Sequence, residues 1–546
     1  MDNKIKLMMV LITLSFALSS CSVEEADVII HNATVHTLDE LNSKAEAIAI
    51  KNGKIIAIGP EHEIMNKYYA PNTIDAQKGG VFPGFIDGHA HLTGFAKGKL
   101  EVSLVGTASF EEVLERCKNF NPVVEHEWLI GRGWDQNDWN IKQFPDNVTL
   151  SELFPDKPVM LTRIDGHAAL LNKKALEIAG FTVDTKIQGG KLLKKNGELT
   201  GVILDNAIEE VKKHIPDYTY EQKKKAFIEA QNELLSYGLT GVHDAGISQE
   251  DLAFFKKLEE EDILKINIYA MLSVTTENID ELQNFTPYES KHISVKSVKL
   301  YADGALGSRG ACLLQPYADD TTNYGFLLYP ISFLDSVAQI CYEKKIQLCT
   351  HCIGDSANRV MLNIYKKYLQ KPNDRRWRIE HAQVIHPDDR VIFNGVTVIP
   401  SVQPTHATSD KPWVESRLGK NRLNEAYAYR SLWEQNKLIA LGTDFPVEHP
   451  NPLYTFYSAV FRKNFFVKND KPFAPEEALT PLQTLKGMTI WNAIASFSEQ
   501  SKGSLEVGKD ADLVILNYDL LQAEESIMEK TEVLYTFVNG ESVFKK

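Results

Sequence analysis

The chain has 546 residues, of which 43% are hydrophobic and 24% are charged, and its formal net charge is −14 with a pI of about 5.6. This length exceeds that of a single minimal core, so we expect one large domain with smaller parts attached. The acidic balance argues against nucleic-acid binding, because no excess of cations is present to displace the counterions of phosphates.

The first twenty residues predict an export signal. Lys4 and Lys6 precede an apolar run from Leu7 to Leu18, which is too short to span a bilayer as a helix. The following Leu18-Ser19-Ser20-Cys21 resembles a bacterial lipobox, after which the cysteine becomes the lipidated first residue. We therefore expect an exported lipoprotein, anchored to a membrane through Cys21 and located in the periplasm or at the outer membrane or cell surface. An ordinary secretory signal with an incidental cysteine is the alternative.

Short β-segments are predicted at both ends of the chain. Ile48–Lys51 and Lys54–Ile56 flank Asn52-Gly53, a dipeptide typical of tight hairpin turns. The C-terminal residues repeat this pattern around Asn539-Gly540. Two β-rich ends around a long middle predict a small β-sandwich assembled from both termini, with one part in residues 21–80 and the other in 500–546.

The middle of the chain, residues 81–499, alternates strand-like runs with amphipathic helices. This alternation is the signature of βα units and a parallel sheet. We expect an α/β fold in which these units close into a TIM-like (β/α)₈ barrel, whose chemistry lies at the carboxyl ends of the strands. Helices are expected over residues 220–237, 331–344 and 357–369.

Six polar residues stand at the ends of apolar, strand-like runs. They are His89, His91, Lys299, His351, His381 and Asp444. His89 and His91 are two residues apart, so on a strand they point to the same face, as in a metal chelate. Two structural histidines in a turn are the alternative.

The spacing of these residues tests whether they share one barrel. A βα unit takes roughly 30 residues, and His351 and His381 are 30 residues apart. This places Lys299 on the fourth strand, the two histidines on the fifth and sixth, and Asp444 on the eighth. The long stretch between His91 and Lys299 predicts an insertion after the first strand, over about residues 125–225. His243, with Asp244, is expected to end the third strand.

Seven sequence blocks, in order along the chain, resemble the amidohydrolase superfamily, specifically the YtcJ-like metal-dependent hydrolases (amidohydrolase family 3). The resemblance runs from about Asp27 to the C-terminus. The blocks are Pro83–His91, Gly131–Gln136, Arg163–His167, Leu300–Ser308, His351–Asp355, Arg378–Gln383 and Gly442–Val447.

The resemblance implies a divalent metal site. His89, His91 and Asp444 would hold one ion, and His351 and His381 a second. A carboxylated Lys299 would bridge them, because a carbamate offsets the metal charge where an ammonium would be repelled. Zinc is the expected metal, with one or two ions per chain.

The resemblance also implies hydrolysis of a C–N bond in a small amide, N-acyl or N-formyl compound. A metal-activated hydroxide would be the nucleophile, with Asp444 as general base and then acid. Two substrate contacts are expected in the insertion, Trp134 and His167, although both residues could instead fix the insertion to the barrel. Further candidates for substrate binding are Asp303, Gln403 and His406.

Two other functions stay open at this stage. A deaminase of heterocyclic bases uses similar ligands around one metal ion and does not need Lys299. A non-catalytic, ligand-binding lipoprotein on a retained barrel is the other alternative. The sequence leaves a homo-oligomer open as well.

Overall fold

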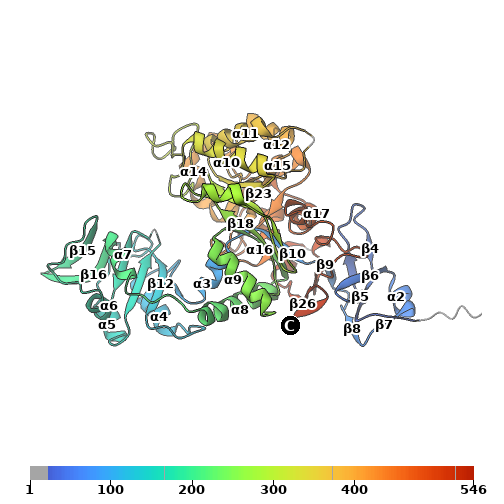
Figure 1. Ribbon diagram of the computed structural model, residues 1–546, viewed down its shortest axis with the longest axis horizontal. Helices are drawn as coiled ribbons and strands as arrows, with labels where there is room; N and C mark the ends of the chain where they lie inside the picture. Colours follow the sequence, from blue (N-terminus) through green and yellow to red (C-terminus); the bar gives the residue numbers. More distant parts are fainter. Residues whose placement is uncertain (1–22, 165, 372, 523) are drawn as a thin grey trace, which may run out of the picture. The chain divides into compact units, whose positions relative to one another are not determined.

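The computed structural model describes residues 23–546 except 165, 372 and 523, so the predicted signal peptide and Cys21 lie outside the described residues. The chain divides into two compact units: one takes in the chain up to Leu92 and from Glu233 onward, and the other is Thr93–Asn232 (Figure 1). Among the helices of the described part, none combines the length and the apolarity needed to cross a membrane.

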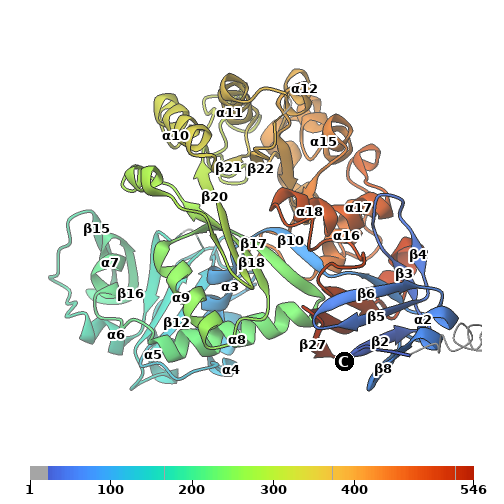
Figure 2. The same ribbon diagram turned by 45° about the vertical axis from the view of Figure 1, so that its right-hand side comes forward.

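Eight parallel strands form a nearly closed barrel in the first unit (Figure 2). Their order around the barrel follows the chain: β10 (Phe85–Ala90), β17 (Leu239–Ile247), β18 (Asn267–Ser273), β20 (Ile293–Tyr301), β21 (Gln347–Cys352), β22 (Arg378–His381), β23 (Ile399–Val402) and β24 (Ala440–Leu441). The first and last strands are joined just beyond their ends, where the Asp444 amide donates to the His89 carbonyl at 2.7 Å and the His91 amide to the Phe445 carbonyl at 2.8 Å. The predicted (β/α)₈ barrel is confirmed.

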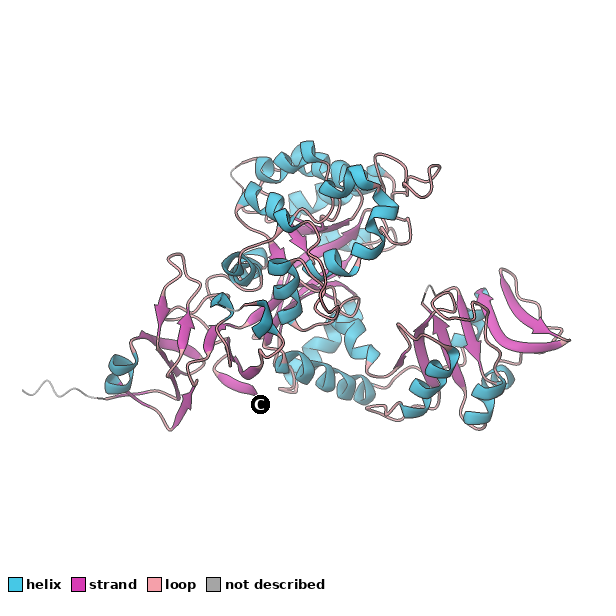
Figure 3. Ribbon diagram, turned by 180° about the vertical axis from the view of Figure 1, so that it is seen from behind, coloured by secondary structure: helices cyan, strands magenta, loops and turns pink. Residues whose placement is uncertain are grey.

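Helices follow the barrel strands and lie on their outer side (Figure 3). Strands such as β10 and β22 are buried along their whole length, as expected when helices cover the outer face and side chains fill the inside. The helices and short 3₁₀ turns after β17 are α9 (Gln249–Glu260), η1 (Ile279–Asn284), α10 (Ile331–Lys344), α11 (Asp355–Tyr368), α12 (Pro387–Val396), α13 (Pro404–Ser409), α14 (Lys411–Leu418), η2 (Lys420–Glu425), α15 (Tyr429–Asn436), α16 (Pro452–Phe461), η3 (Pro475–Glu477), α17 (Pro481–Gly487), α18 (Ile490–Ala495), η4 (Leu520–Gln522) and α19 (Glu525–Met528). The three helices expected from the sequence are present as α8 (Tyr220–Ser236), α10 and α11.

The chain ends form a β-sandwich in the same unit. One sheet is N-terminal only, whereas the other joins strands from both ends of the chain. The first sheet contains β6 (Lys54–Gly59), β5 (Ala47–Lys51), β2 (Val28–His31) and β8 (Asn72–Asp75), and the second contains β27 (Glu541–Lys545), β26 (Val533–Val538), β25 (Leu513–Leu516), β9 (Gly80–Pro83), β3 (Thr34–His36) and β4 (Lys44–Ala45). Ile30 and Ile48 of the first sheet share one apolar core with Val35, Ile515 and Phe537 of the second. Since β9 continues directly into β10, the sandwich is tied to the barrel's first strand.

The second unit is a mixed α/β layer structure. Its sheet runs β11 (Val102–Ser103), β12 (Leu129–Trp134), β13 (Val159–Arg163), β14 (Ala168–Leu171), β16 (Glu198–Asp205) and β15 (Gly190–Lys195). Helices α4 (Phe110–Asn119) and α5 (Val148–Leu153) share an apolar cluster with one face of this sheet, and α6 (Lys173–Ile178) and α7 (Asn206–Lys212) with the other.

The second unit corrects two details of the sequence analysis. It begins at Thr93, before the predicted start near residue 125. It also occupies all of the chain between the first barrel strand and α8, so His243 lies on the second barrel strand, β17, and not on the third.

Candidate metal centre

The polar strand ends meet at one end of the barrel. Lys299 lies on β20, the fourth barrel strand, and His351 and His381 lie on the fifth and sixth, as their spacing predicts. His89 lies on β10, and Asp444 follows the short eighth strand β24. Parallel barrel strands present their carboxyl ends on the same side, which brings these side chains together.

Asp444 is the centre of the cluster. Its Oδ1 lies 3.0 Å from His91 Nε2 and 3.6 Å from His89 Nε2, and its Oδ2 lies 3.8 Å from His406 Nε2. Ligand atoms around a tetrahedral zinc ion, with bonds of about 2.0–2.1 Å, stand about 3.3 Å apart. Two sets of donor atoms lie close enough together to hold an ion: His89 with His91 and Asp444, and His381 with His406 and Asp444.

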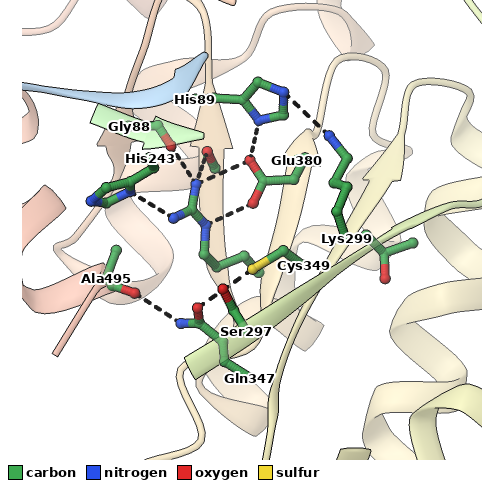
Figure 4. A network of polar contacts seen from close by, with 12 residues as sticks. Gly88, His89, His243, Ser297, Lys299, Gln347, Cys349, Glu380 and Ala495 are labelled. Carbon is green, nitrogen blue, oxygen red and sulfur yellow. Dashed lines mark hydrogen bonds and ion pairs between the residues drawn. The ribbon is translucent and has the colours of Figure 1, made fainter. Parts of the chain in front are cut away.

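Neighbouring side chains fix which ring nitrogen of each histidine faces the centre. His89 Nδ1 lies 2.5 Å from Glu380 Oε2, and His381 Nδ1 lies 2.8 Å from Gln403 Oε1. Figure 4 shows the His89 ring between Glu380 and Lys299. In both rings the outer nitrogen is engaged, so Nε2 is left for the centre, the usual arrangement for a metal-binding imidazole.

Glu380 is itself held by Arg378, and both side chains are fully buried. Arg378 Nε lies 2.7 Å from Glu380 Oε1, and its Nη2 donates to the Gly88 carbonyl at 2.5 Å. Its Nη1 lies 2.9 Å from His243 Nδ1. Burial alone would raise the pKa of Glu380, but Arg378 and His89 hold it well below its usual range. Glu380 therefore stays ionised and keeps the His89 ring in place.

Lys299 is completely buried, and its Nζ lies 3.2 Å from His89 Nε2. Burial lowers the pKa of Lys299, although Glu380 and Asp444 oppose this change. The other lysine of the strand, Lys296, pairs instead with Glu289 at 3.0 Å. Lys299 is thus the lysine that faces the centre.

The electrostatics favour the protonation states that bind metal. Burial would raise the pKa of Asp444, but the His91, His89 and His406 imidazoles lower it to about 2. Burial and the neighbouring Lys299 lower the pKa of His89 to about 4 and that of His351 to about 3. An ionised carboxylate and neutral imidazoles are the forms that coordinate a cation.

Unpartnered polar atoms provide a test of whether a cation fits. Three potential metal-ligand atoms of the cluster are buried without a hydrogen-bond partner among the described residues: His351 Nε2, His406 Nε2 and Asp444 Oδ1. Buried polar atoms are normally hydrogen-bonded. Imidazole nitrogens and a carboxylate oxygen are donors that suit zinc and related divalent metals, so the residues present fit a metal ion.

Two predicted substrate residues of the barrel support other groups. Asp303 is buried and accepts from the backbone amides of Cys312, Ile353 and Gly354 at 2.8–3.0 Å, so it fixes the loop around them. Gln403 orients His381. His406, the third candidate of the barrel, faces Asp444 directly.

The two predicted substrate residues of the insertion lie in the second unit. Trp134 is 1% exposed, packs against Trp139 and donates to the Leu161 carbonyl at 2.7 Å. This burial argues against direct substrate contact, and the contacts of Trp134 with Trp139 and Leu161 stabilise the second unit itself. The His167 side chain is 77% exposed and lies 3.1 Å from Asp205.

Three functional residues were not singled out from the sequence: Glu380, Arg378 and Asp87. Asp87 accepts from the backbone amides of His89 at 3.1 Å and Thr443 at 3.0 Å, and so joins the first strand to the loop of Asp444. All three lie within three positions of a site residue in the sequence, as in Arg378-Ile379-Glu380-His381. Charged residues inside an otherwise apolar strand were the available signal, because such residues are rarely fully buried unless paired.

A (β/α)₈ barrel that gathers histidines, a lysine and an aspartate at the carboxyl ends of its strands defines the class of metal-dependent barrel hydrolases. The model of the amidohydrolase family matches residues 72–544, and the chain belongs to this family. It is 31% identical to the Bacillus subtilis protein YtcJ, which carries the name of an amidohydrolase, over 94% of this chain and 99% of that protein.

Two further relatives are informative. An N-substituted formamide deformylase of Arthrobacter pascens is 26% identical, over 94% of this chain and 97% of that protein. Among solved structures, an uncharacterized metal-dependent hydrolase from Pyrococcus horikoshii superimposes with a TM-score of 0.76 and 28% identity, over 91% of this chain and 99% of that one.

Proposed function

We propose that this chain hydrolyses the C–N bond of a small amide, N-acyl or N-formyl compound. The observation that carries the proposal is the position of Asp444, a buried carboxylate that faces three imidazoles and has no hydrogen-bond partner on Oδ1 among the described residues. Similarity to a protein named N-substituted formamide deformylase supports the choice of bond.

The metal would be held by His89, His91, His351, His381, Lys299 and Asp444, and we propose zinc as the ion. When bound, it supplies Lewis acidity, which polarises a carbonyl group and makes water more acidic. Lys299 would act as its carbamate, formed when its neutral amine adds to CO₂ and releases a proton. The anionic oxygens of the carbamate match a divalent cation where a buried ammonium would be repelled.

The protein's own residues account for positioning and proton transfer. Glu380 and Gln403 hold the imidazoles of His89 and His381, so the donor atoms need little rearrangement. Asp444 would accept a proton from the attacking water as that water adds to the substrate carbonyl carbon. Asp444 would then pass the proton to the leaving nitrogen as the C–N bond breaks, giving a carboxylic acid and an amine.

A product-resolved substrate panel tests this proposal. The zinc-loaded full chain is offered N-formyl amines, N-acyl amino acids, cyclic amides and aminated heterocycles, and both amine and ammonia are measured. Release of a carboxylic acid and an amine supports the proposal, whereas ammonia from heterocycles alone would favour a deaminase. Turnover of none of these compounds, despite bound zinc, would refute the proposed bond class.

Two asparagine variants separate chemistry from folding in this assay. Asp444→Asn should abolish turnover, because the amide cannot take up the proton. Asp389→Asn is the matched control: Asp389 is also buried, but it lies on α12, where it accepts from Arg359 at 2.8 Å. The control should keep its activity.

We further propose that the protein is exported and anchored through a lipid on Cys21. The basis is the sequence alone: two lysines, an apolar run and a lipobox-like ending. In a host that processes bacterial lipoproteins, the wild type should partition with membranes and Cys21→Ser should not. Equal partitioning of both would refute the anchor, and Cys312→Ser serves as the control for loss of a cysteine.

A further inference from the structure

A second recess lies at the amino ends of the barrel strands, at the opposite end of the barrel from the metal centre. It has a volume of about 260 Å³ and is lined by the beginnings of β10, β17, β18 and β20 and by the loops before β20 and after α18. A Cβ atom at Gly241 of β17 would meet no other atom closer than 3.5 Å, so the missing side chain leaves part of this space open. Pockets for drug-sized ligands measure about 300–1,000 Å³, so the recess suits a smaller molecule.

Three residues that line the recess carry a buried polar atom without a hydrogen-bond partner in the described part of the chain. These atoms are His243 Nε2, His292 Nε2 and Ser294 Oγ. The His243 residue is 1% exposed and His292 is 5% exposed. Buried polar atoms are normally hydrogen-bonded to protein or to ordered water, so three unpartnered atoms around one recess indicate that a polar molecule occupies it.

Asn267 determines which role His292 Nε2 can play. The Asn267 amide nitrogen donates to the Thr240 carbonyl at 2.9 Å and to Asp512 Oδ2 at 3.0 Å. The Asn267 oxygen, 3.2 Å from His292 Nδ1, is therefore an acceptor, and Nδ1 carries the proton. Burial and the neighbouring Lys291 lower the pKa of His292 to about 4, so the ring is neutral near pH 7. His292 Nε2 is thus a hydrogen-bond acceptor.

Arg378 determines the role of His243 in the opposite sense. A guanidinium group can only donate, and Arg378 Nη1 donates to His243 Nδ1 at 2.9 Å. The proton of the His243 ring is therefore on Nε2, which is a hydrogen-bond donor. The Ser294 hydroxyl can donate or accept. The recess thus offers a bound molecule one acceptor, one donor and one hydroxyl group.

The charged side chains of the lining are paired or lie at its rim. Lys502 donates to Asp512 Oδ2 at 2.8 Å, and Lys296 pairs with Glu289 at 3.0 Å. The third lysine of the lining, Lys291, is exposed. Burying a charged ligand beside neutral imidazoles would be costly, so the recess favours an uncharged one.

We propose that this recess is a second binding site, which takes a small uncharged molecule with an amide group. The amide oxygen accepts from His243 Nε2, the amide N–H donates to His292 Nε2, and the Ser294 hydroxyl bonds to either group. A carboxylate of the same shape lacks the N–H and brings a charge. The site goes beyond the proposed reaction, because it contains none of the metal-centre residues and binding there requires no turnover.

Crystals of the zinc-loaded full-length chain, soaked in trifluoroacetamide or in trifluoroacetate, test the location. The two probes have the same shape, but only the amide is uncharged and has an N–H. We expect trifluoroacetamide in the recess, with its nitrogen about 2.7–3.2 Å from His292 Nε2, and no trifluoroacetate there. Ordered water alone in the recess, or trifluoroacetate at the same place, would overturn the proposal.

Titrations followed by ¹⁹F NMR test binding in solution. Ser294→Ala removes one of the unpartnered atoms and should bind trifluoroacetamide about three- to tenfold more weakly than the wild type. His292→Phe should show a similar loss, and Ser294→Ala decides alone if His292→Phe does not fold. Ser336→Ala is the matched control, because the Ser336 hydroxyl lies on α10 and donates to the Ser332 carbonyl at 2.8 Å. Binding that Ser294→Ala leaves unchanged would overturn the proposal.

Discussion

Replacing Glu380 by glutamine keeps the shape of the side chain and removes its charge. In the wild type the carboxylate lies 2.7 Å from Arg378 Nε and 2.5 Å from His89 Nδ1, and both ionic side chains are fully buried. Removing one partner of such a pair leaves an uncompensated buried charge and costs about 3–5 kcal/mol of unfolding free energy.

The same substitution should also weaken metal binding. One end of the amide is an NH₂ group, and where it faces His89 Nδ1 it makes that nitrogen an acceptor. The proton of the imidazole then moves to Nε2, which can no longer coordinate a cation. Losses of this kind are about 10–100-fold in metal affinity, or about 1.4–2.7 kcal/mol.

Denaturant unfolding and zinc titration of Glu380→Gln measure the two effects. The control is Glu209→Gln, since Glu209 forms an exposed pair with Lys212 at 2.7 Å, and breaking such a pair costs about 0–1 kcal/mol. A loss of stability in Glu380→Gln no larger than in this control, together with unchanged zinc affinity, would refute the reasoning.

Three further outcomes are expected. Lys299→Ala should lose metal and activity and recover part of both when a small carboxylate is added. The control Lys296→Ala should behave like the wild type. Retention of full activity by Lys299→Ala would argue for one ion and a deaminase. Trp134→Phe should lower stability by about 1–3 kcal/mol with unchanged KM, and a raised KM at unchanged stability would restore Trp134 as a substrate contact. Glu499 pairs with Arg376 at 2.8 Å, and although burial would raise its pKa, Arg376 lowers it below the usual 4.5. The ion pair stabilises the fold by about 1 kcal/mol; this stabilisation is present above pH 4.5 and is lost as the pH falls through the lowered pKa of Glu499. The unfolding free energies of wild type and Glu499→Gln should therefore converge in acid. A difference that stays constant with pH would contradict this direction of the effect.

The barrel can be predicted from the sequence because the patterns that indicate its strands are local. An apolar run followed by a polar residue marks several of the strand ends, and the regular spacing of Lys299, His351 and His381 orders those three strands correctly. The hairpin turns at Asn52-Gly53 and Asn539-Gly540 are likewise local and lie between paired strands.

The remaining features depend on contacts between distant residues. The ion pair of Glu380 with Arg378 matters because it reaches His89, which is 291 positions away in the chain. The position of His243 on the second strand depends on an insertion that takes up all of the chain before α8. The burial of Trp134 depends on how the second unit packs, which the spacing of residues along the sequence does not predict.

Metal removal and restoration test the central claim most directly. The purified full chain is stripped of metal with a chelator, and the hydrolysis of an N-formyl amine that the intact enzyme turns over is followed as zinc is added back. We expect the activity to vanish with the metal and to return in proportion to bound zinc in the wild type, but not in Asp444→Asn. Undiminished hydrolysis by the metal-free chain, or by metal-loaded Asp444→Asn, would contradict the account.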